Sequence, residues 1–169
     1  AEEGGYPHVM RKEIMEQPDV IRSTVRPRVR DGRIDLGLSH ISPDDIMACD
    51  RIFIVACGSA SYVGQVAKHY IERYTRIPVT VELASEFRYS NPIVTDRTIA
   101  IVISQSGETI DTLFALREAK SRGAHVLSIV NVVGSTIANE SEAVIYTWAG
   151  PEIAVATTTA YSAQLSVCY

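Results

Sequence analysis

Thr98-Ile-Ala-Ile-Val-Ile-Ser-Gln-Ser-Gly-Glu-Thr-Ile-Asp111 runs from a row of apolar residues into a strip of small polar ones. The apolar run at 98–103 is continuous rather than alternating, which is typical of a strand covered on both faces. The polar strip leads into a predicted helix from about Thr109 to Arg122, where Gly123 supplies an end signal. A strand, a polar loop and a helix in this order predict one unit of a parallel α/β sheet.

The same pattern recurs along the chain. Further short apolar runs predict strands at 52–56, 79–83, 126–130 and 143–147, and an amphipathic stretch to about Thr75 follows the first of them. Strands separated by helical stretches indicate right-handed crossovers in a parallel sheet. We therefore predict an α/β fold, a three-layer α/β/α sandwich with a roughly five-stranded parallel sheet.

The N-terminal 41 residues have a different character. Residues 8–26 mix apolar and charged positions and predict an amphipathic helix, with Pro18 limiting its length or marking a new start. Residues 27–41 are basic, contain glycine and predict a loop. Ser42-Pro43-Asp44-Asp45 then predicts a helix start, with Ser42 as N-cap and acidic residues in the first turn. We expect a lead-in helix and loop at 1–41 and one domain at 42–169.

Both ends of the chain carry signals of processing. The sequence begins without methionine, and its last seven residues are apolar and helix-compatible, with no glycine, proline or basic last turn to end a helix. We expect a domain truncated at its C-terminus.

Composition excludes several classes of protein. The length of 169 residues fits one domain, and the net charge of −4 without a basic run argues against nucleic acid and anionic membranes as partners. No apolar stretch approaches the roughly 18 residues of a membrane span, and no signal peptide is visible. The three cysteines and four histidines fall in no metal-ligand spacing, so we expect no metal, reduced thiols and a cytoplasmic protein.

Two polar loops follow predicted strands, at 58–61 and at 104–109. Ligands of open parallel sheets bind at the carboxyl ends of strands, near a topological switch point. Each loop also opens a helix, whose first N–H groups and partial positive charge suit an anion. Ser104, Ser106 and Thr109 can add hydroxyl donors, and Gln105 can bridge a phosphate and a sugar hydroxyl. The 104–109 loop therefore predicts a phosphate site without lysine or arginine.

Other readings remain open on the residues alone. The loops match neither the Walker phosphate loop nor the dinucleotide loop, and serines at helix starts often serve only as caps. Glu82, Glu86 and Glu108 are candidates for a general acid or base, although exposed carboxylates are common. Cys57 stands at a strand end as a candidate nucleophile, where a small residue is also wanted for packing.

Five segments, taken in order, resemble one family, the glutamine–fructose-6-phosphate aminotransferases. They are Cys57-Gly-Ser59, Glu82-Leu-Ala-Ser-Glu-Phe-Arg-Tyr89, Ser104-Gln-Ser-Gly-Glu-Thr-Ile-Asp-Thr112, Asn131-Val-Val-Gly-Ser-Thr136 and Ala149-Gly-Pro-Glu-Ile153. The segment from Tyr6 to Pro18 resembles the lead into the isomerase region of that family. The resemblance covers residues 6–169 and points to the first sugar isomerase (SIS) domain of that region.

The resemblance implies a function and a set of site residues. The family converts fructose 6-phosphate and glutamine into glucosamine 6-phosphate and glutamate, without a cofactor. Ser104, Gln105, Ser106 and Thr109 match its phosphate-binding positions. The positions that match its sugar contacts are Ser59, Val155 through its backbone, and Thr157.

The resemblance also implies partners outside this chain. The acid–base residues of the family lie in a second SIS domain and a C-terminal tail, and ammonia comes from a glutaminase domain. We therefore expect no catalytic residue here, an inactive fragment of a homodimeric enzyme, and binding of fructose 6-phosphate and glucosamine 6-phosphate.

This sequence departs from the family at two positions, and two rival functions remain. Ala60 stands where many members have serine, and Thr159 where the family usually has lysine, so a contact and a charge near the site are in doubt. The rivals are a stand-alone SIS sugar-phosphate isomerase and a non-catalytic sugar-phosphate sensor.

Overall fold

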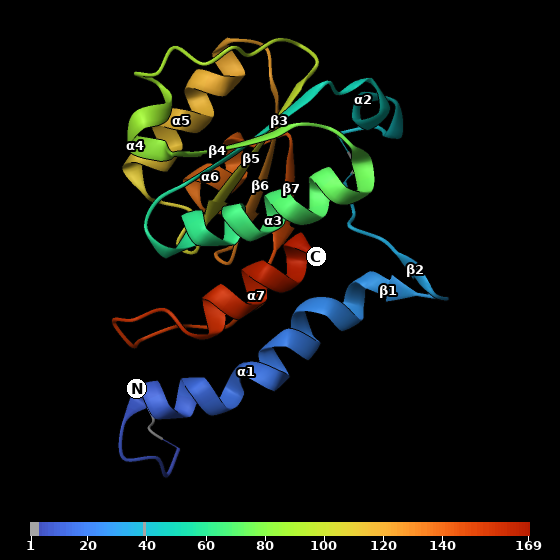
Figure 1. Ribbon diagram of the computed structural model, residues 1–169. Helices are drawn as coiled ribbons and strands as arrows, with labels where there is room; N and C mark the ends of the chain where they lie inside the picture. Colours follow the sequence, from blue (N-terminus) through green and yellow to red (C-terminus); the bar gives the residue numbers. More distant parts are fainter. Residues whose placement is uncertain (1–3, 39) are drawn as a thin grey trace.

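The computed structural model describes residues 4–38 and 40–169 (Figure 1). Its centre is a five-stranded parallel sheet in the order β4-β3-β5-β6-β7. The strands are β3 (Arg51–Ala56), β4 (Val79–Leu83), β5 (Thr98–Ser104), β6 (His125–Val130) and β7 (Ala143–Tyr146). All five predicted strands are confirmed, and so is the α/β/α class.

The two faces of the sheet carry separate cores, which explains why its strands are continuously apolar. Ile52, Ile54 and Ala56 of β3 belong to one core, and Phe53 and Val55 belong to the other. Helices α3 (Ser59–Thr75) and α7 (Thr159–Cys168) cover the first face. Helices α4 (Ala84–Phe87), α5 (Ile110–Ser121) and α6 (Thr136–Glu140) cover the second (Figure 1).

Helix α2 (Pro43–Ala48) precedes the sheet and begins as predicted. The Ser42 hydroxyl accepts a hydrogen bond from the backbone N–H of Asp45, and the Asp45 carboxylate accepts one from the N–H of Ser42. This reciprocal pair is a capping box, which satisfies two N–H groups that a helix start leaves open.

The N-terminal helix α1 (Val9–Val25) forms an outer layer against α7 (Figure 1). A 3-10 turn, η1 (Arg26–Arg28), and a small hairpin of β1 (Val29–Arg30) and β2 (Arg33–Ile34) follow it. The expectation that Pro18 limits the helix is wrong, because α1 continues through it. Proline cannot donate to the carbonyl of Ile14, and the side chain of Gln17 donates to that carbonyl instead, at 3.3 Å.

The amphipathic pattern of α1 is present, but its apolar residues are not buried. Met10, Ile14 and Met15 are exposed, as are Ile21 and Val25 nearer the helix end. The side that meets the body of the protein is polar: Glu13 and Thr24 are both buried. The apolar residues of α1 are therefore not part of a closed core, and two of them, Ile21 and Val25, line a cavity beside α7.

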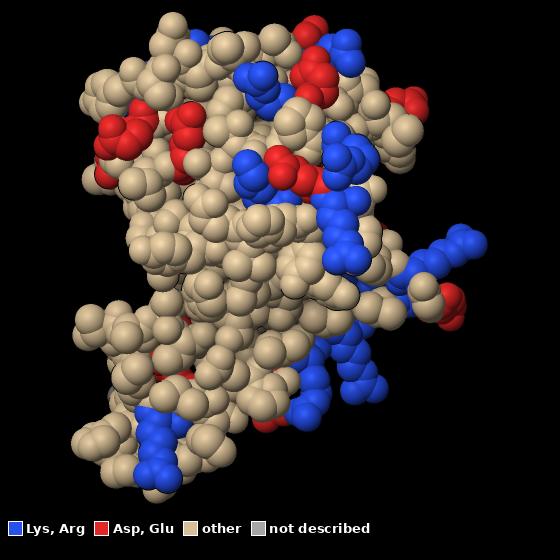
Figure 2. Space-filling model, in the orientation of Figure 1, with Lys and Arg blue, Asp and Glu red and all other residues tan. Residues whose placement is uncertain are grey.

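Charged side chains are unevenly spread over the face seen in Figure 2. Lys and Arg gather beside the end of α1 and the β1–β2 hairpin, whereas the centre, over α7, is nearly free of charge. In the described part of the chain, no helix combines the length and the apolar character needed to cross a membrane.

Candidate functional site

The strand order creates a switch point between β3 and β5. The chain leaves β3 through α3 on one face of the sheet, and leaves β5 through α5 on the opposite face. The loops after the two strands therefore diverge and leave a crevice at their carboxyl ends, where α/β proteins bind ligands.

A polar pocket of about 240 Å³ occupies this crevice. Its lining residues are Cys57, Ser59, Ala60, Ile103, Ser104, Gln105, Ser106, Thr109, Thr112, Glu152, Thr157 and Gln164. Six of the seven predicted site residues are among them, although they come from three separate parts of the sequence. The exception is Val155, whose side chain is fully exposed and which does not line the pocket. The ligand contacts of all seven stay predictions.

The 104–109 loop is shaped by its own hydroxyls. The Ser104 hydroxyl accepts from the N–H of Gly107 at 3.1 Å and lies 3.2 Å from the hydroxyl of Thr109. The Ser106 hydroxyl accepts from the N–H of Glu108 at 3.1 Å. Accepting one bond leaves the Ser106 proton free to donate, and in the Ser104–Thr109 pair one of the two hydroxyl protons stays free. The loop is therefore held in one shape while hydroxyl donors remain available to a ligand.

A second set of contacts fixes the loop to the segment after β6. The N–H of Ile137 donates to the carbonyl of Gly107 at 3.0 Å, and the N–H of Thr136 donates to the Glu108 carboxylate at 2.7 Å. The bond from the Thr136 backbone lowers the pKa of Glu108. Glu108 thus acts as an anchor for the loop and does not line the pocket, which gives no support to its candidacy as an acid or base.

Two features of the pocket favour a ligand over simple helix capping. Thr109 is the N-cap of α5, yet in the described structure its side chain makes no capping hydrogen bond, so the first turn of α5 keeps its N–H groups open. Among the described residues, the buried Oε1 of Gln105 also has no hydrogen-bond partner. Buried polar atoms normally have one. The pocket therefore offers donors for an anion and an acceptor for a hydroxyl group.

Glu152 gives the pocket its one carboxylate among the described lining residues, and that carboxylate is already engaged. It accepts from the N–H groups of Thr158 and Ala160, at 2.6 and 3.1 Å, and from the hydroxyl of Thr157 at 3.0 Å. Its negative charge therefore occupies the start of α7, where an anion would otherwise be favoured.

Three further polar residues line the pocket and were not predicted to do so: Thr112, Glu152 and Gln164. Gln164 is buried, and its signal was a lone amide in the otherwise apolar end of the chain. Glu152 and Thr112 lay inside matched motifs but were assigned no contact. Cys57, weighed as a nucleophile, does line the pocket and accepts a weak hydrogen bond from the Thr112 hydroxyl at 3.6 Å.

Of the two departures from the family, one lies in the polar pocket and the other lies beside it. Ala60 lines the pocket without a polar group. Thr159 is buried at the start of α7, and its hydroxyl lies 3.4 Å from the Glu152 carboxylate.

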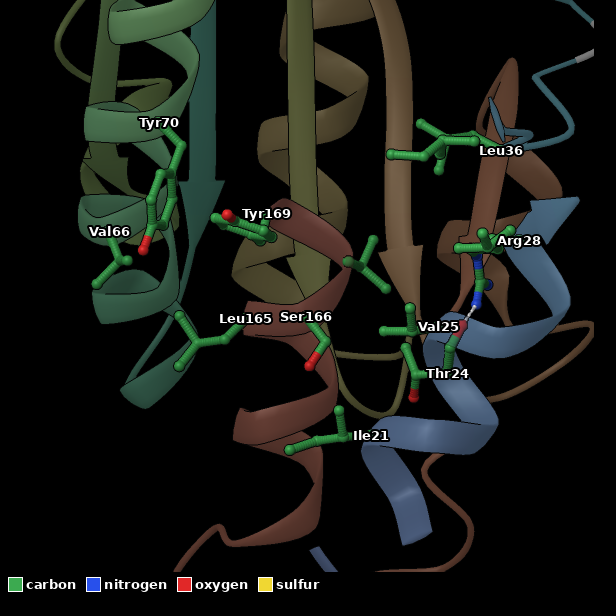
Figure 3. A pocket seen from close by; sticks show the side chains of 13 residues that line it. Ile21, Thr24, Val25, Arg28, Leu36, Val66, Tyr70, Leu165, Ser166 and Tyr169 are labelled. Carbon is green, nitrogen blue, oxygen red and sulfur yellow. Dashed lines mark hydrogen bonds between the residues drawn. The ribbon is translucent and has the colours of Figure 1, made fainter. Parts of the chain in front are cut away.

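A larger, apolar cavity of about 540 Å³ lies between α1, α3 and α7 (Figure 3). Its apolar lining includes Ile21 and Val25 of α1, Leu165 of α7, and Val66 and Tyr70 of α3 (Figure 3). No predicted site residue lines it. Its chemistry suits a hydrocarbon surface and not a phosphate.

The fold and the polar pocket define a domain of the sugar isomerase class, and the comparison with family models agrees. The model described as "SIS domain" matches residues 45–169, and the chain belongs to this family.

The relatives of this chain include glutamine–fructose-6-phosphate aminotransferases. The chain is 55% identical over its whole length to glutamine–fructose-6-phosphate aminotransferase [isomerizing] of Caldanaerobacter subterraneus, and equally to that of Clostridium acetobutylicum. It spans 28% of the length of each. The solved C-terminal domain of glucosamine-fructose-6-phosphate aminotransferase from Francisella tularensis superimposes with a TM-score of 0.93 at 40% identity, over 99% of this chain and 47% of that one. The resemblance inferred from the motifs is confirmed.

Proposed function

We propose that this chain is the first SIS domain of a glutamine–fructose-6-phosphate aminotransferase and binds fructose 6-phosphate and glucosamine 6-phosphate in the polar pocket. The observation that carries the proposal is the 104–109 loop, which presents hydroxyl donors and an open helix start at the switch point.

The proposed roles follow from the chemistry of each group. Ser104, Ser106 and Thr109 donate to phosphate oxygens together with the first N–H groups of α5. Gln105 uses its open acceptor for a sugar hydroxyl. The remaining sugar contacts come from Ser59 and Thr157 and from the backbone of Val155. The domain thus holds and orients the substrate, which lowers the barrier for groups that act on it.

Proton transfer and ammonia release are assigned to other parts of the enzyme, in a second SIS domain and a glutaminase domain. The exposed apolar side of α1 and the cavity beside α7 support contacts with further protein, either those domains or the other subunit of a homodimer. Under this proposal, residues 1–41 lead into the SIS domain at 42–169. The three unpaired cysteines among the described residues support a cytoplasmic location.

The role of the loop hydroxyls is tested by Ser106→Ala. We expect the substitution to weaken fructose 6-phosphate binding by about 1 kcal/mol or somewhat more, because hydrogen bonds to charged groups contribute roughly 1.5–3 kcal/mol. Binding of fructose should change less, and salt should matter little because no ion pair holds the phosphate. Isothermal calorimetry with both ligands at low and high salt measures each effect.

Ser121→Ala is the matched control, because Ser121 is exposed at the far end of α5. An equal loss for fructose and its phosphate would show that Ser106 contacts the sugar. A steep salt dependence would show that a distant basic residue holds the phosphate and that the serines are only helix caps.

A further inference from the structure

Glu13 is a buried carboxylate that the proposed function leaves unused. It lies on α1 and is 3% exposed. A carboxylate is rarely so buried unless other groups satisfy it, because leaving water costs free energy. Its partners therefore indicate what the residue does.

In the described structure, hydrogen bonds to the Glu13 carboxylate come from the segment between β7 and α7. One carboxylate oxygen accepts from the N–H groups of Ile153 and Ala154, at 2.8 and 3.0 Å. The other accepts from the hydroxyl of Thr158 at 2.8 Å. Glu13 thus reaches across about 140 positions of sequence to hold both ends of a short segment that contains Val155 and Thr157.

The same segment is held from inside the pocket by Glu152. Its carboxylate accepts from Thr157, Thr158 and Ala160, so it orders the start of α7. The hydroxyl oxygen of Thr158 lies between the two carboxylates, 2.8 Å from an oxygen of Glu13 and 3.1 Å from an oxygen of Glu152. Glu13 on the outside and Glu152 on the inside therefore fix the segment that carries the proposed sugar contacts.

A further contact keeps the helix in register with this segment. One turn after Glu13, the side chain of Gln17 accepts a hydrogen bond from the hydroxyl of Ser162 on α7. The spacing of four residues places Glu13 and Gln17 on the same side of α1, toward α7. The lead-in helix is thus fixed to the start of α7 at two successive turns.

We propose that Glu13 is a positioning residue of the sugar-phosphate site, holding residues 153–158 so that Thr157 and the backbone of Val155 meet the sugar. The inference rests on the proposed function, and it makes α1 part of the binding site although α1 does not line the pocket. It also separates two halves of the site. The 104–109 loop, which holds the phosphate, makes no contact with Glu13 in the described structure, so losing Glu13 should affect the sugar half alone.

The test compares Glu13→Ala and Glu13→Gln with Glu16→Gln as control, because Glu16 is a half-exposed carboxylate on the same helix that pairs with Lys12. We expect Glu13→Ala to weaken fructose 6-phosphate binding roughly tenfold, because about 1.4 kcal/mol corresponds to a factor of ten. Inorganic phosphate should bind within about twofold of normal. Glu13→Gln keeps an acceptor for the two N–H groups and should recover part of the loss. Amide hydrogen exchange should accelerate at Ile153 and Ala154 in Glu13→Ala and stay unchanged in Glu16→Gln.

The results of these measurements either support or overturn the positioning role of Glu13. Normal fructose 6-phosphate binding by Glu13→Ala, or an equal loss of inorganic phosphate binding, would overturn the positioning role while leaving the proposed function intact. If Glu13→Ala does not fold, the same comparison is made with Glu13→Gln, for which normal affinity and normal exchange overturn the proposal. If the unaltered chain binds no fructose 6-phosphate, the proposed function fails and the role of Glu13 fails with it.

Discussion

Gly107 is the residue of the 104–109 loop that packs against Ser135. It has a φ of +66°, in the left-handed region that favours glycine. A Cβ added there would lie 2.1 Å from the hydroxyl oxygen and 2.5 Å from the Cβ of Ser135, which is buried at the start of α6. Backbone conformation and a close approach thus both require glycine in this loop.

Gly107→Ala should therefore cost more than its backbone strain alone. Gly134→Ala is the matched control, because its φ is +74° but nothing lies within 4 Å of the added Cβ. We expect the control to lose about 1–2 kcal/mol of unfolding free energy, and Gly107→Ala to lose on the order of 1–3 kcal/mol more from overpacking. Urea unfolding measures both, and calorimetry should show weaker fructose 6-phosphate binding only for Gly107→Ala. Equal losses of stability would refute the packing of Gly107 on Ser135.

At the scale of elements, α1 matters through the polar side chains that join it to α7 and the segment before it. The pKa of Glu13 lies below its ordinary value of 4.5. Burial raises this pKa, but hydrogen bonds from Ala154, Ile153 and Thr158, together with the charge of Lys12, outweigh burial. The folded state thus favours the ionised carboxylate.

The stabilisation by Glu13 should depend on pH in a defined direction. Because the pKa is lower in the folded state, the contribution is complete above about 4.5 and is lost as pH falls through the folded-state pKa. We expect the unaltered chain to exceed Glu13→Gln in free energy of unfolding by about 1–2 kcal/mol at pH 7, and the difference to shrink as the pH falls through the folded-state pKa of Glu13. Urea unfolding of both proteins between pH 7 and 3 measures it. A difference that stays constant with pH would show that the charge of Glu13 contributes nothing.

The elements also show how far the sequence could predict this structure. The five strands were predictable because burial on both faces makes each of them continuously apolar, as in Ile52–Ala56. The position of the 104–109 loop was predictable because small polar residues there separate a continuous apolar run from a helical pattern. The orientation of α1 could not be predicted in this way. An apolar stripe indicates which side of a helix avoids water, but it does not indicate which other element or protein packs on that side. The contact of Glu13 with Ile153 was also hidden, because no local pattern joins positions so far apart.

For the whole molecule, the central claim is that neutral donors at the switch point hold the phosphate. Arginines gather elsewhere, beside the end of α1 and the β1–β2 hairpin, and offer a competing anion site (Figure 2). Charge alone would place a phosphate there. We propose instead that it binds in the polar pocket, where open N–H groups and hydroxyls converge.

A crystal structure of the chain with fructose 6-phosphate decides between these two positions. The account predicts the phosphate against the 104–109 loop, within hydrogen-bond distance of the Ser104, Ser106 and Thr109 side chains and the first N–H groups of α5. It also predicts the sugar turned toward Thr157. A phosphate bound among the arginines of residues 22–33, with the polar pocket empty of ligand, would contradict it.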